Sequence, residues 1–238
     1  MKKIIKRTIL WVVLTALAAG LVLGIVYGTR GYKQYKAALE ECSITEKVVD
    51  LQSMASYCTL EQMPERYPDI VLAAEDHRFY KHSGIDPVGL LRAIWNNIRT
   101  FSLKEGGSTI TQQLAKNLYF SNSRTAERKI AEGFMALALE RELEKDEILE
   151  LYINCIYYGG GQYCLYDAAE FYFDKEPMEL TLGEQALIAG LPNAPSAYAP
   201  HVDPTLAEQR RLQVIDKMVR YEVVTEEEAK DIRNEKVV

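Results

Sequence analysis

The chain lacks several of the short patterns that mark common enzyme classes. No G-x-x-x-x-G-K-[ST] or G-x-G-x-x-G pattern occurs, so a nucleotide is not indicated as a ligand. No G-x-S-x-G elbow is present to hold a serine nucleophile. With only three His and no C-x-x-C pair, neither a His-based metal site nor a structural zinc site is indicated. The chemistry therefore has to be sought among carboxylates, amides and cations.

The chain also lacks the basic excess of a nucleic-acid-binding protein. It has 28 Lys and Arg against 34 Asp and Glu, a formal net charge of −6. Four of the basic residues (Lys2, Lys3, Lys6 and Arg7) precede the first apolar run, so the remainder carries about −10. This balance predicts no nucleic acid partner, and it makes local basic clusters more noticeable.

Charged residues are missing from Thr8 to Thr29, a run that exceeds the about 20 residues needed to cross the hydrocarbon core as a helix. Because basic residues precede it, the positive-inside rule predicts residues 1–7 as a cytoplasmic tail and 8–29 as a transmembrane anchor. The catalytic part is then extracytoplasmic, in a single-pass protein of the cell membrane. A cleaved signal peptide is the alternative, but the apolar run continues well past the cleavage-like Ala16-Leu17-Ala18.

Beyond the anchor the pattern predicts a mainly α fold, with a charged connector over 30–50 and one domain over 51–238. Capping boxes at Thr109 and Thr181 mark two helix starts. No convincing strand alternation is present. Further helices are predicted over 125–143, 146–158 and 167–173, with two more between 204 and 236.

The stretch from Pro87 to Phe101 is amphipathic. Its apolar side carries Val88, Leu91, Ile94, Trp95 and Ile98, with Arg92 and Arg99 on the other side. Two interpretations stay open. One is an ordinary packed helix, and the other is a helix that rests in the membrane interface, where Trp and Arg are favoured.

The four cysteines are even in number, and an extracytoplasmic position permits disulfides. Two of them flank a Gly-Gly-Gly turn and could meet, but unpaired buried thiols are an equal alternative. The sequence leaves the pairing open for Cys42, Cys58, Cys155 and Cys164.

The first candidate for chemistry is Glu75, which directly follows an apolar run from Ile70 to Ala74. Desolvation disfavours the charged form of a carboxylate, so its pKa is expected to be raised, which suits proton transfer. The adjacent Asp76 points about 100° away on a helix and cannot share that role. It is predicted to cap, or to pair with His82 or Lys81. The alternative for both acids is a solvated helix end.

A second acid occurs in the run from Arg128 to Glu132. Because Glu132 follows Arg128 by four positions and Lys129 by three, the three side chains can share one helix face. One interpretation is a surface ion pair. The other is a pair of cations that hold a diphosphate beside a carboxylate, joined by Lys116.

Five runs resemble the ordered motifs of the family 51 peptidoglycan glycosyltransferases: EDHRFYKHSGID, GGSTITQQLAKN, RKIAE, ILELYINCIYYGGGQY and LGEQALIAGLPNAPSAYAP. They cover about residues 51–200, and the absence of a following penicillin-binding domain resembles the monofunctional, membrane-anchored members. The resemblance implies a lysozyme-like helical glycosyltransferase domain. It also implies polymerisation of lipid II into β-1,4-linked glycan strands, with inversion and release of undecaprenyl diphosphate.

The resemblance also implies individual roles. Glu75 matches the base that deprotonates the acceptor 4-hydroxyl. Glu132 matches the acid that assists at the donor diphosphate, directly or through a divalent cation (Mg or Mn), so the metal requirement stays open. The basic residues that would stabilise the departing diphosphate are Lys116, Arg128 and Lys129. The residues that would line the sugar cleft are Ser108, Thr109, Gln112, Gln113 and Asn117. Structural support of the first motif would come from Asp76, Phe79, His82 and Gly84.

The chain departs from the family pattern at Cys164, where glycine is usual, and at Tyr166-Asp167. It also has Asp174 in place of the glycine of Phe-Gly-Lys. A Cβ at a glycine position requires a shifted turn where φ is positive.

Two other functions are compatible with parts of the pattern. A lytic, lysozyme-like glycan cleaver would share the fold, but it has no diphosphate leaving group for the basic residues to bind. A non-catalytic, membrane-anchored scaffold is the third interpretation. The expected partners of a polymerase are lipid II, the growing glycan strand and the membrane, with transpeptidases and other wall-synthesis proteins as further candidates.

Overall fold

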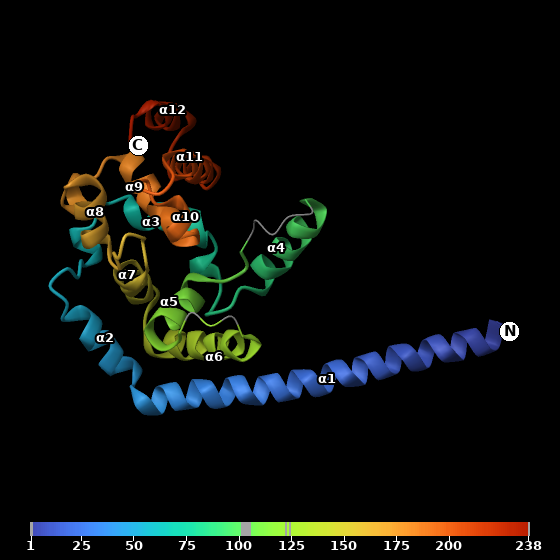
Figure 1. The fold of residues 1–238 in the computed structure, drawn as a ribbon. Coiled ribbons are helices and arrows are strands. Elements are labelled where there is room, and N and C mark those ends of the chain that lie inside the picture. Colours follow the sequence, from blue (N-terminus) through green and yellow to red (C-terminus); the bar gives the residue numbers. More distant parts are fainter. Residues whose placement is uncertain (1, 101–105, 122, 124, 238) are drawn as a thin grey trace.

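A computed structural model describes residues 2–100, 106–121, 123 and 125–237 (Figure 1). Two predicted positions, Met1 in the cytoplasmic tail and Phe101 at the end of the amphipathic stretch, lie outside these ranges. Within them the regular structure is helical, and the only β-type pairings are two isolated bridges. The prediction of a mainly α fold is therefore confirmed.

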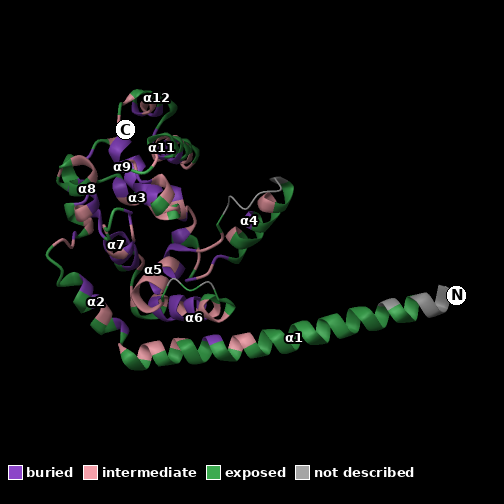
Figure 2. Cartoon of the chain, viewed as in Figure 1, coloured by how far each residue is buried: buried purple, intermediate pink, exposed green. Residues whose placement is uncertain are grey.

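The first helix, α1 (Lys2–Glu41), is a single rod that contains the apolar run and continues through most of the charged connector. Its apolar part is long and apolar enough to cross a membrane, with a mean hydropathy of 2.7 in its most apolar window. None of that window is buried against the rest of the chain, and this part of α1 projects away from the other helices (Figure 2).

The other helices form the body that carries the cleft. They are α2 (Ile44–Gln52), α3 (Tyr67–Glu75), α4 (Pro87–Thr100), α5 (Ile110–Tyr119), α6 (Ala126–Glu142), α7 (Lys145–Cys155), α8 (Leu165–Phe173), α9 (Leu182–Gly190), α10 (Pro195–Tyr198), α11 (Pro204–Arg220) and α12 (Glu226–Asn234), with 3₁₀ turns at Leu60–Gln62, Phe79–Lys81, Pro177–Glu179 and Leu191–Asn193.

Local sequence explains where several of these helices begin and end. Thr109 and Thr181 form the predicted capping boxes at the starts of α5 and α9. Helix α7 ends at Cys155 rather than at the predicted Tyr158. The reason is the glycine turn that follows, because the Tyr158 N–H donates to the Gln162 carbonyl across it at 2.8 Å.

The core lies where α7 and α9 are enclosed by their neighbours. Helix α5 packs on α6 and α7, while α9 packs on α3 and α11. The buried side of α3 consists of residues such as Ile70, Val71 and Ala74. Burial of apolar area at about 25 cal/mol per Å² holds α3 in place, and this fixes the position of the residue at its end, Glu75.

Helix α4 stands away from the body, and its apolar side is not covered by any described part of the chain (Figures 1 and 2). The five apolar residues of that side, Val88, Leu91, Ile94, Trp95 and Ile98, have exposed fractions between 46% and 68%. The interpretation of this stretch as an ordinary packed helix is therefore wrong.

The departures from the family pattern have different consequences for the backbone. Cys164 has φ −136° and caps α8, with its Sγ accepting the Asp167 N–H at 3.4 Å, so its Cβ requires no shifted turn. Asp174 instead has φ 53°, in the left-handed region that favours glycine, at the end of α8. This conformation costs about 1 kcal/mol for a residue with a Cβ. All four cysteines are free thiols.

Candidate active site

One cleft of about 790 Å³ opens between α3, α4, α5, α6 and α11. Its lining is strongly basic although the whole chain is acidic. Seven cations face three carboxylates there: Arg92, Lys116, Arg128, Lys129, Arg210, Lys217 and Arg220 against Glu75, Glu132 and Asp216. Clefts lined by one sign of charge concentrate ligands of the opposite sign, so the cleft is suited to an anionic ligand.

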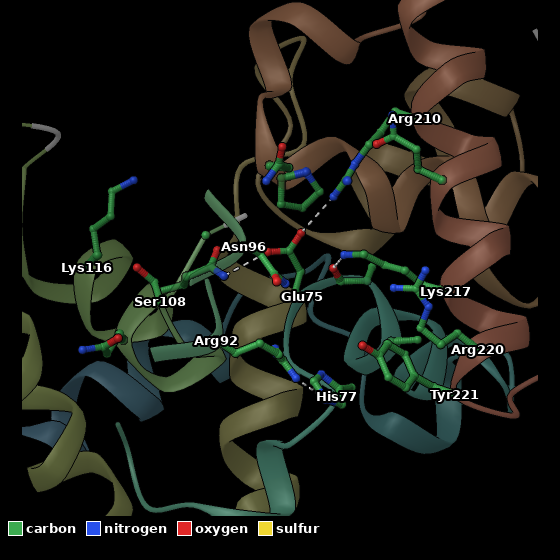
Figure 3. Close-up of a pocket in the computed structure, with 18 of the residues that line it drawn as sticks. Glu75, His77, Arg92, Asn96, Ser108, Lys116, Arg210, Lys217, Arg220 and Tyr221 are labelled. Carbon is green, nitrogen blue, oxygen red and sulfur yellow. Dashed lines mark hydrogen bonds and ion pairs between the residues drawn. The ribbon is translucent and has the colours of Figure 1, made fainter. Parts of the chain in front are cut away.

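Glu75 lies at the end of α3 and points into this cleft (Figure 3). Its side chain is only 9% exposed. Gln113 Nε2 donates to one carboxylate oxygen at 3.0 Å, and Arg210 Nη2 lies 3.4 Å from the other. The carboxylate is thus held in one orientation by an amide from α5 and a guanidinium from α11.

Arg210 and two further cations of α11 were missed by the sequence reasoning. Arg210 Nε donates to the Gly190 carbonyl at 3.0 Å, and Lys217 Nζ donates to the Ala74 carbonyl. The sequence does contain a pattern, since Arg210, Lys217 and Arg220 are spaced to share one side of a helix. Nothing in the sequence indicates that this side faces Glu75.

At another part of the cleft, Glu132 is paired with the two cations predicted from the sequence. Lys129 Nζ lies 2.8 Å from one Glu132 oxygen, and Arg128 Nη1 donates to the other. Glu132 is 1% exposed, so this group is not a surface ion pair. Lys129 also donates to Ser108 Oγ at 2.8 Å. Partial desolvation in the cleft, with the positive charges of Arg128 and Lys116, lowers the pKa of Lys129 to about 8, although its side chain is 47% exposed.

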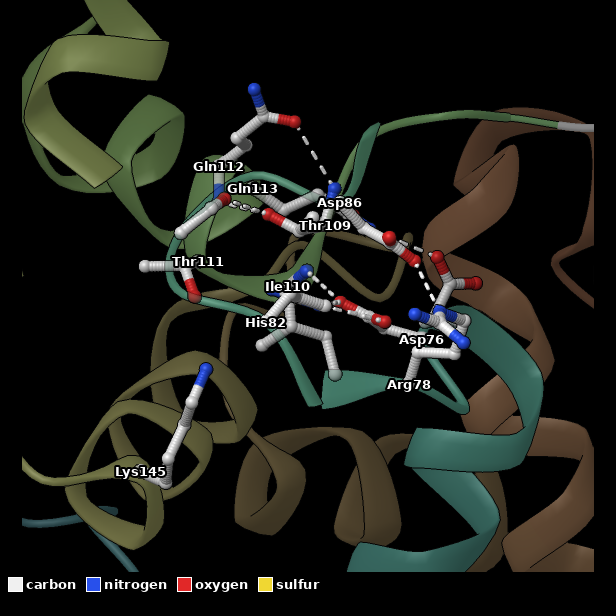
Figure 4. A network of polar contacts seen from close by, with 12 residues as sticks. Asp76, Arg78, His82, Asp86, Thr109, Ile110, Thr111, Gln112, Gln113 and Lys145 are labelled. Atoms are coloured by element: carbon white, nitrogen blue, oxygen red, sulfur yellow. Dashed lines mark hydrogen bonds and ion pairs between the residues drawn. The ribbon is translucent and has the colours of Figure 1, made fainter. Parts of the chain in front are cut away.

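Asp76 turns away from the cleft and connects the motifs behind it (Figure 4). It is buried, with its carboxylate 3.0 Å from His82 Nε2 and accepting the Ile110 N–H at 3.1 Å. This carboxylate at the start of α5 also suits the helix dipole. Asp76 therefore pairs with His82, one of the two partners expected for it, and accepts the first N–H of α5.

The remaining support residues hold the same region. Phe79 is 1% exposed, beneath Lys145. Gly84 has φ 73°, and a Cβ there would lie 3.0 Å from the backbone of Ala136 in α6, so this turn requires glycine.

The predicted sugar-binding side chains divide into two groups. Ser108, Gln112 and Gln113 line the cleft, as does Lys116. Thr109 does not, because it is buried with its hydroxyl donating to the Gly84 carbonyl at 2.6 Å and accepting the Gln112 N–H at 3.1 Å. Asn117 is also not part of the lining.

His77 and Tyr221 stack at the mouth of the cleft, with ring centroids 4.2 Å apart. Arg92 Nη1 lies 3.0 Å from His77 Nε2. Burial and the positive charge of Arg92 lower the pKa of His77. Its ring is therefore neutral at neutral pH and accepts this hydrogen bond.

The protein residues around Glu132 do not form a site that would hold a divalent cation by themselves. Both Glu132 oxygens are engaged by cations. In the described ranges, no three His, Cys, Asp or Glu gather as ligands. Mg²⁺ commonly takes only one or two carboxylates and completes its shell with substrate phosphates and water. A cation here would therefore depend on phosphate oxygens of the substrate.

A buried carboxylate held by an amide and a guanidinium, in the same cleft as a basic cluster, is typical of an enzyme that acts on a polar, anionic substrate. Residues 43–219 match the family model described as Transglycosylase. The chain belongs to this family, the family 51 glycosyltransferases.

Similar proteins include penicillin-binding protein 1A of Neisseria lactamica, 40% identical over 206 residues, which are 86% of this chain and 26% of that protein. Penicillin-binding protein 1A of Aquifex aeolicus is 44% identical over 178 residues, 75% of this chain and 24% of that protein. The chain thus spans about a quarter of the length of these curated relatives. A crystal structure of penicillin-binding protein 1A from Haemophilus influenzae matches 54% of this chain and 16% of its own, with 35% identity and a TM-score of 0.39.

The lowered pKa of Lys129 gives a testable pH dependence. Affinity for inorganic diphosphate, measured by calorimetry, should fall as the pH rises through about 8, because Lys129 loses its proton there. Lys129→Arg should move this loss to higher pH, since a guanidinium stays charged. The matched change Lys230→Arg, at an exposed position of α12, should leave the profile unchanged. An identical profile for Lys129→Arg would show that another group titrates.

Proposed function

We propose that this cleft polymerises lipid II into β-1,4-linked glycan strands and releases undecaprenyl diphosphate. The observation that carries the proposal is the pairing of two arrangements in one cleft. Glu75 is oriented by Gln113 and Arg210, while Glu132 lies beside two cations. Membership of the family and the names of the relatives support it.

Glu75 is the proposed general base. It would accept the proton of the acceptor 4-hydroxyl as that oxygen attacks C1 of the donor sugar. The new C1–O bond forms while the bond from C1 to the diphosphate oxygen breaks, and the electron pair leaves with the diphosphate. Because attack and departure occur on opposite sides of C1, the α-linked donor gives a β-linked product, with no covalent enzyme intermediate.

The departing diphosphate gains negative charge in the transition state. Lys116, Arg128 and Lys129 line the cleft at the place proposed for it. Cations fixed before the reaction stabilise such charge without reorganisation, which is commonly the largest contribution to catalysis. Glu132 keeps Arg128 and Lys129 in place through its two ion pairs. A glycan cleaver would have no use for this basic group.

The direct test is to incubate the full chain with lipid II and to separate the products by size. We expect glycan strands from the native protein. Glu75→Gln should lower the rate by about a hundredfold or more, as for loss of a general base. The glutamine keeps the shape of the side chain, and its amide oxygen can still accept the hydrogen bond from Gln113.

The matched control is Glu227→Gln, an exposed position of α12, which should leave the rate unchanged. Cleavage of preformed glycan in place of polymerisation would indicate the lytic function. A folded protein that neither polymerises nor cleaves would indicate a scaffold. Full activity of Glu75→Gln would contradict the assignment of the base.

We further propose that α1 crosses the cell membrane with its N-terminus in the cytoplasm and the cleft outside. The exposed apolar part of α1 and the basic residues that precede it support this orientation. It also brings the cleft to the surface at which a lipid-linked substrate presents its diphosphate.

Protease added to intact spheroplasts should test the orientation. An epitope at the C-terminus should be lost, because the domain is accessible from outside. An epitope at the N-terminus should be lost only after the membrane is disrupted. The opposite pattern would show an inverted protein, and loss of both epitopes from intact spheroplasts would show that the anchor has been removed.

The exposed apolar side of α4 supports a second membrane contact. Leu91 and Trp95 are 68% and 67% exposed. Arg92 follows Val88 and Arg99 follows Trp95 by four positions, so the two cations flank the apolar side, and the prediction that they lie opposite to it is wrong. Buried apolar area and interfacial Trp and Arg are what bind such helices to lipid. We propose that this side lies in the outer surface of the same bilayer that α1 crosses.

With Trp11→Phe, Trp95 is the only tryptophan of the chain. Its fluorescence should be quenched when the protein is placed in vesicles of brominated phospholipid, relative to unbrominated ones, because contact with the bromines requires insertion. A control that carries Trp11→Phe, Trp95→Phe and Asn97→Trp moves the tryptophan about 160° around α4, away from its apolar side, and should be quenched less. Equal emission in both lipids for Trp95 would contradict the contact.

A further inference from the structure

Helix α6 packs along the continuation of the apolar helix α1 (Figure 1), and it also lines the cleft. One side of α6 carries Arg128, Lys129 and Glu132 into the cleft. Its other side, with Glu127, Ile130 and Phe134, meets α1. The same stretch of α6, about two turns long, therefore serves the cleft on one side and packs on α1 on the other.

Polar and aromatic contacts join the two helices along this second side. Arg30 Nη1 lies 3.4 Å from Glu127 Oε1. The ring of Tyr32 meets Phe134 edge to face at a centroid distance of 5.3 Å, and Tyr35 stacks on Phe134 at 5.9 Å. Aromatic pairs of this kind contribute about 0.5–1.5 kcal/mol beyond the area that they bury.

At Gly31 the two helices approach too closely to admit a side chain. A Cβ at this buried position would lie 2.7 Å from Ile130 Cβ and 2.8 Å from the carbonyl oxygen of Glu127. Both distances are shorter than a van der Waals contact allows. The other glycines of α1 differ, because a Cβ at Gly20, Gly24 or Gly28 would meet nothing within 4 Å. Only at residue 31 does the packing require the absence of a side chain.

A shift of α6 at this contact would reach the cleft. Ile130 directly follows Lys129, and one of the three blocking atoms is a backbone oxygen of α6, which cannot rotate away. A side chain at residue 31 would therefore force α1 and the α6 backbone at Glu127–Ile130 apart. Interdigitated interiors transmit such a displacement instead of absorbing it.

We infer that Gly31 is a positioning residue: the close packing of the anchor helix on α6 sets where Arg128, Lys129 and Glu132 stand in the cleft. This inference rests on the proposed function for its biological purpose. The lipid tail of the substrate fixes the height of its diphosphate at the membrane surface. The helix that crosses the membrane would set the height of the cations that receive it.

The test compares Gly31→Ala with Gly28→Ala in the full chain, reconstituted in vesicles. Affinity for inorganic diphosphate and the kcat and KM for lipid II are measured together. Gly31→Ala is expected to weaken diphosphate binding and to lower kcat by about tenfold, within the loss of up to about a hundredfold that a misplacement near 1 Å can cause. Gly28→Ala should match the native protein in both.

A purely structural effect is distinguished by two further variants. In a Lys129→Gln background, Gly31→Ala should weaken diphosphate binding by much less than tenfold, because residues that act through one another are not additive. Phe134→Ala loosens the same contact without a clash and should also weaken diphosphate binding. It keeps the inference testable if Gly31→Ala melts at a much lower temperature or fails to fold.

Native affinity in both Gly31→Ala and Phe134→Ala would overturn the inference, as would full additivity with Lys129→Gln. Absence of diphosphate binding by the native protein would overturn it as well. Loss of polymerisation alone has a different meaning. If the native protein makes no glycan but Gly31→Ala still weakens diphosphate binding and Gly28→Ala does not, the proposed function fails and the positioning role stands.

Discussion

The buried carboxylate of Asp76 lies 3.0 Å from His82 Nε2 and accepts the Ile110 backbone N–H at 3.1 Å. These contacts join the end of α3, the turn that follows it and the first residue of α5. Glu75 is the residue before Asp76, and Gln113 is three residues beyond Ile110, so their 3.0 Å hydrogen bond depends on this junction. A buried carboxylate is costly unless it is paired and hydrogen-bonded, and here those same bonds hold the cleft together.

The basic group around Glu132 depends on a second constraint, the position of α6. Two sites of close approach define that position, and both require glycine. Gly84 lets the first motif reach the α6 backbone at Ala136, and Gly31 lets α1 reach it at Ile130. Helix α6 is thus held between the catalytic motif and the anchor. An ion group buried as deeply as Glu132 contributes little net stability, which agrees with a role in binding charge.

Much of the fold could be predicted from the sequence because local chemistry marks it. Thr109 and Thr181 identify helix starts through side-chain bonds to their own backbone, and the apolar run of α1 is visible by its length. The end of α7 was placed too late because the Tyr158 N–H pairs across a turn. Thr109 was predicted to line the sugar cleft together with its neighbours in the motif. Its hydroxyl instead donates to the Gly84 carbonyl and does not face the cleft.

By itself, the sequence determined the helices, the apolar segment and the acids and cations available for chemistry, because each depends on residue type and short-range spacing. Only the tertiary structure decided which of them meet. It placed Arg210 beside Glu75, 135 positions away in the chain, and it left the apolar side of α4 uncovered. It also packed Gly31 tightly against α6, a contact that Gly28, on the same helix, does not share. Contacts between helices depend on the packing of the whole chain, and no local pattern records that packing.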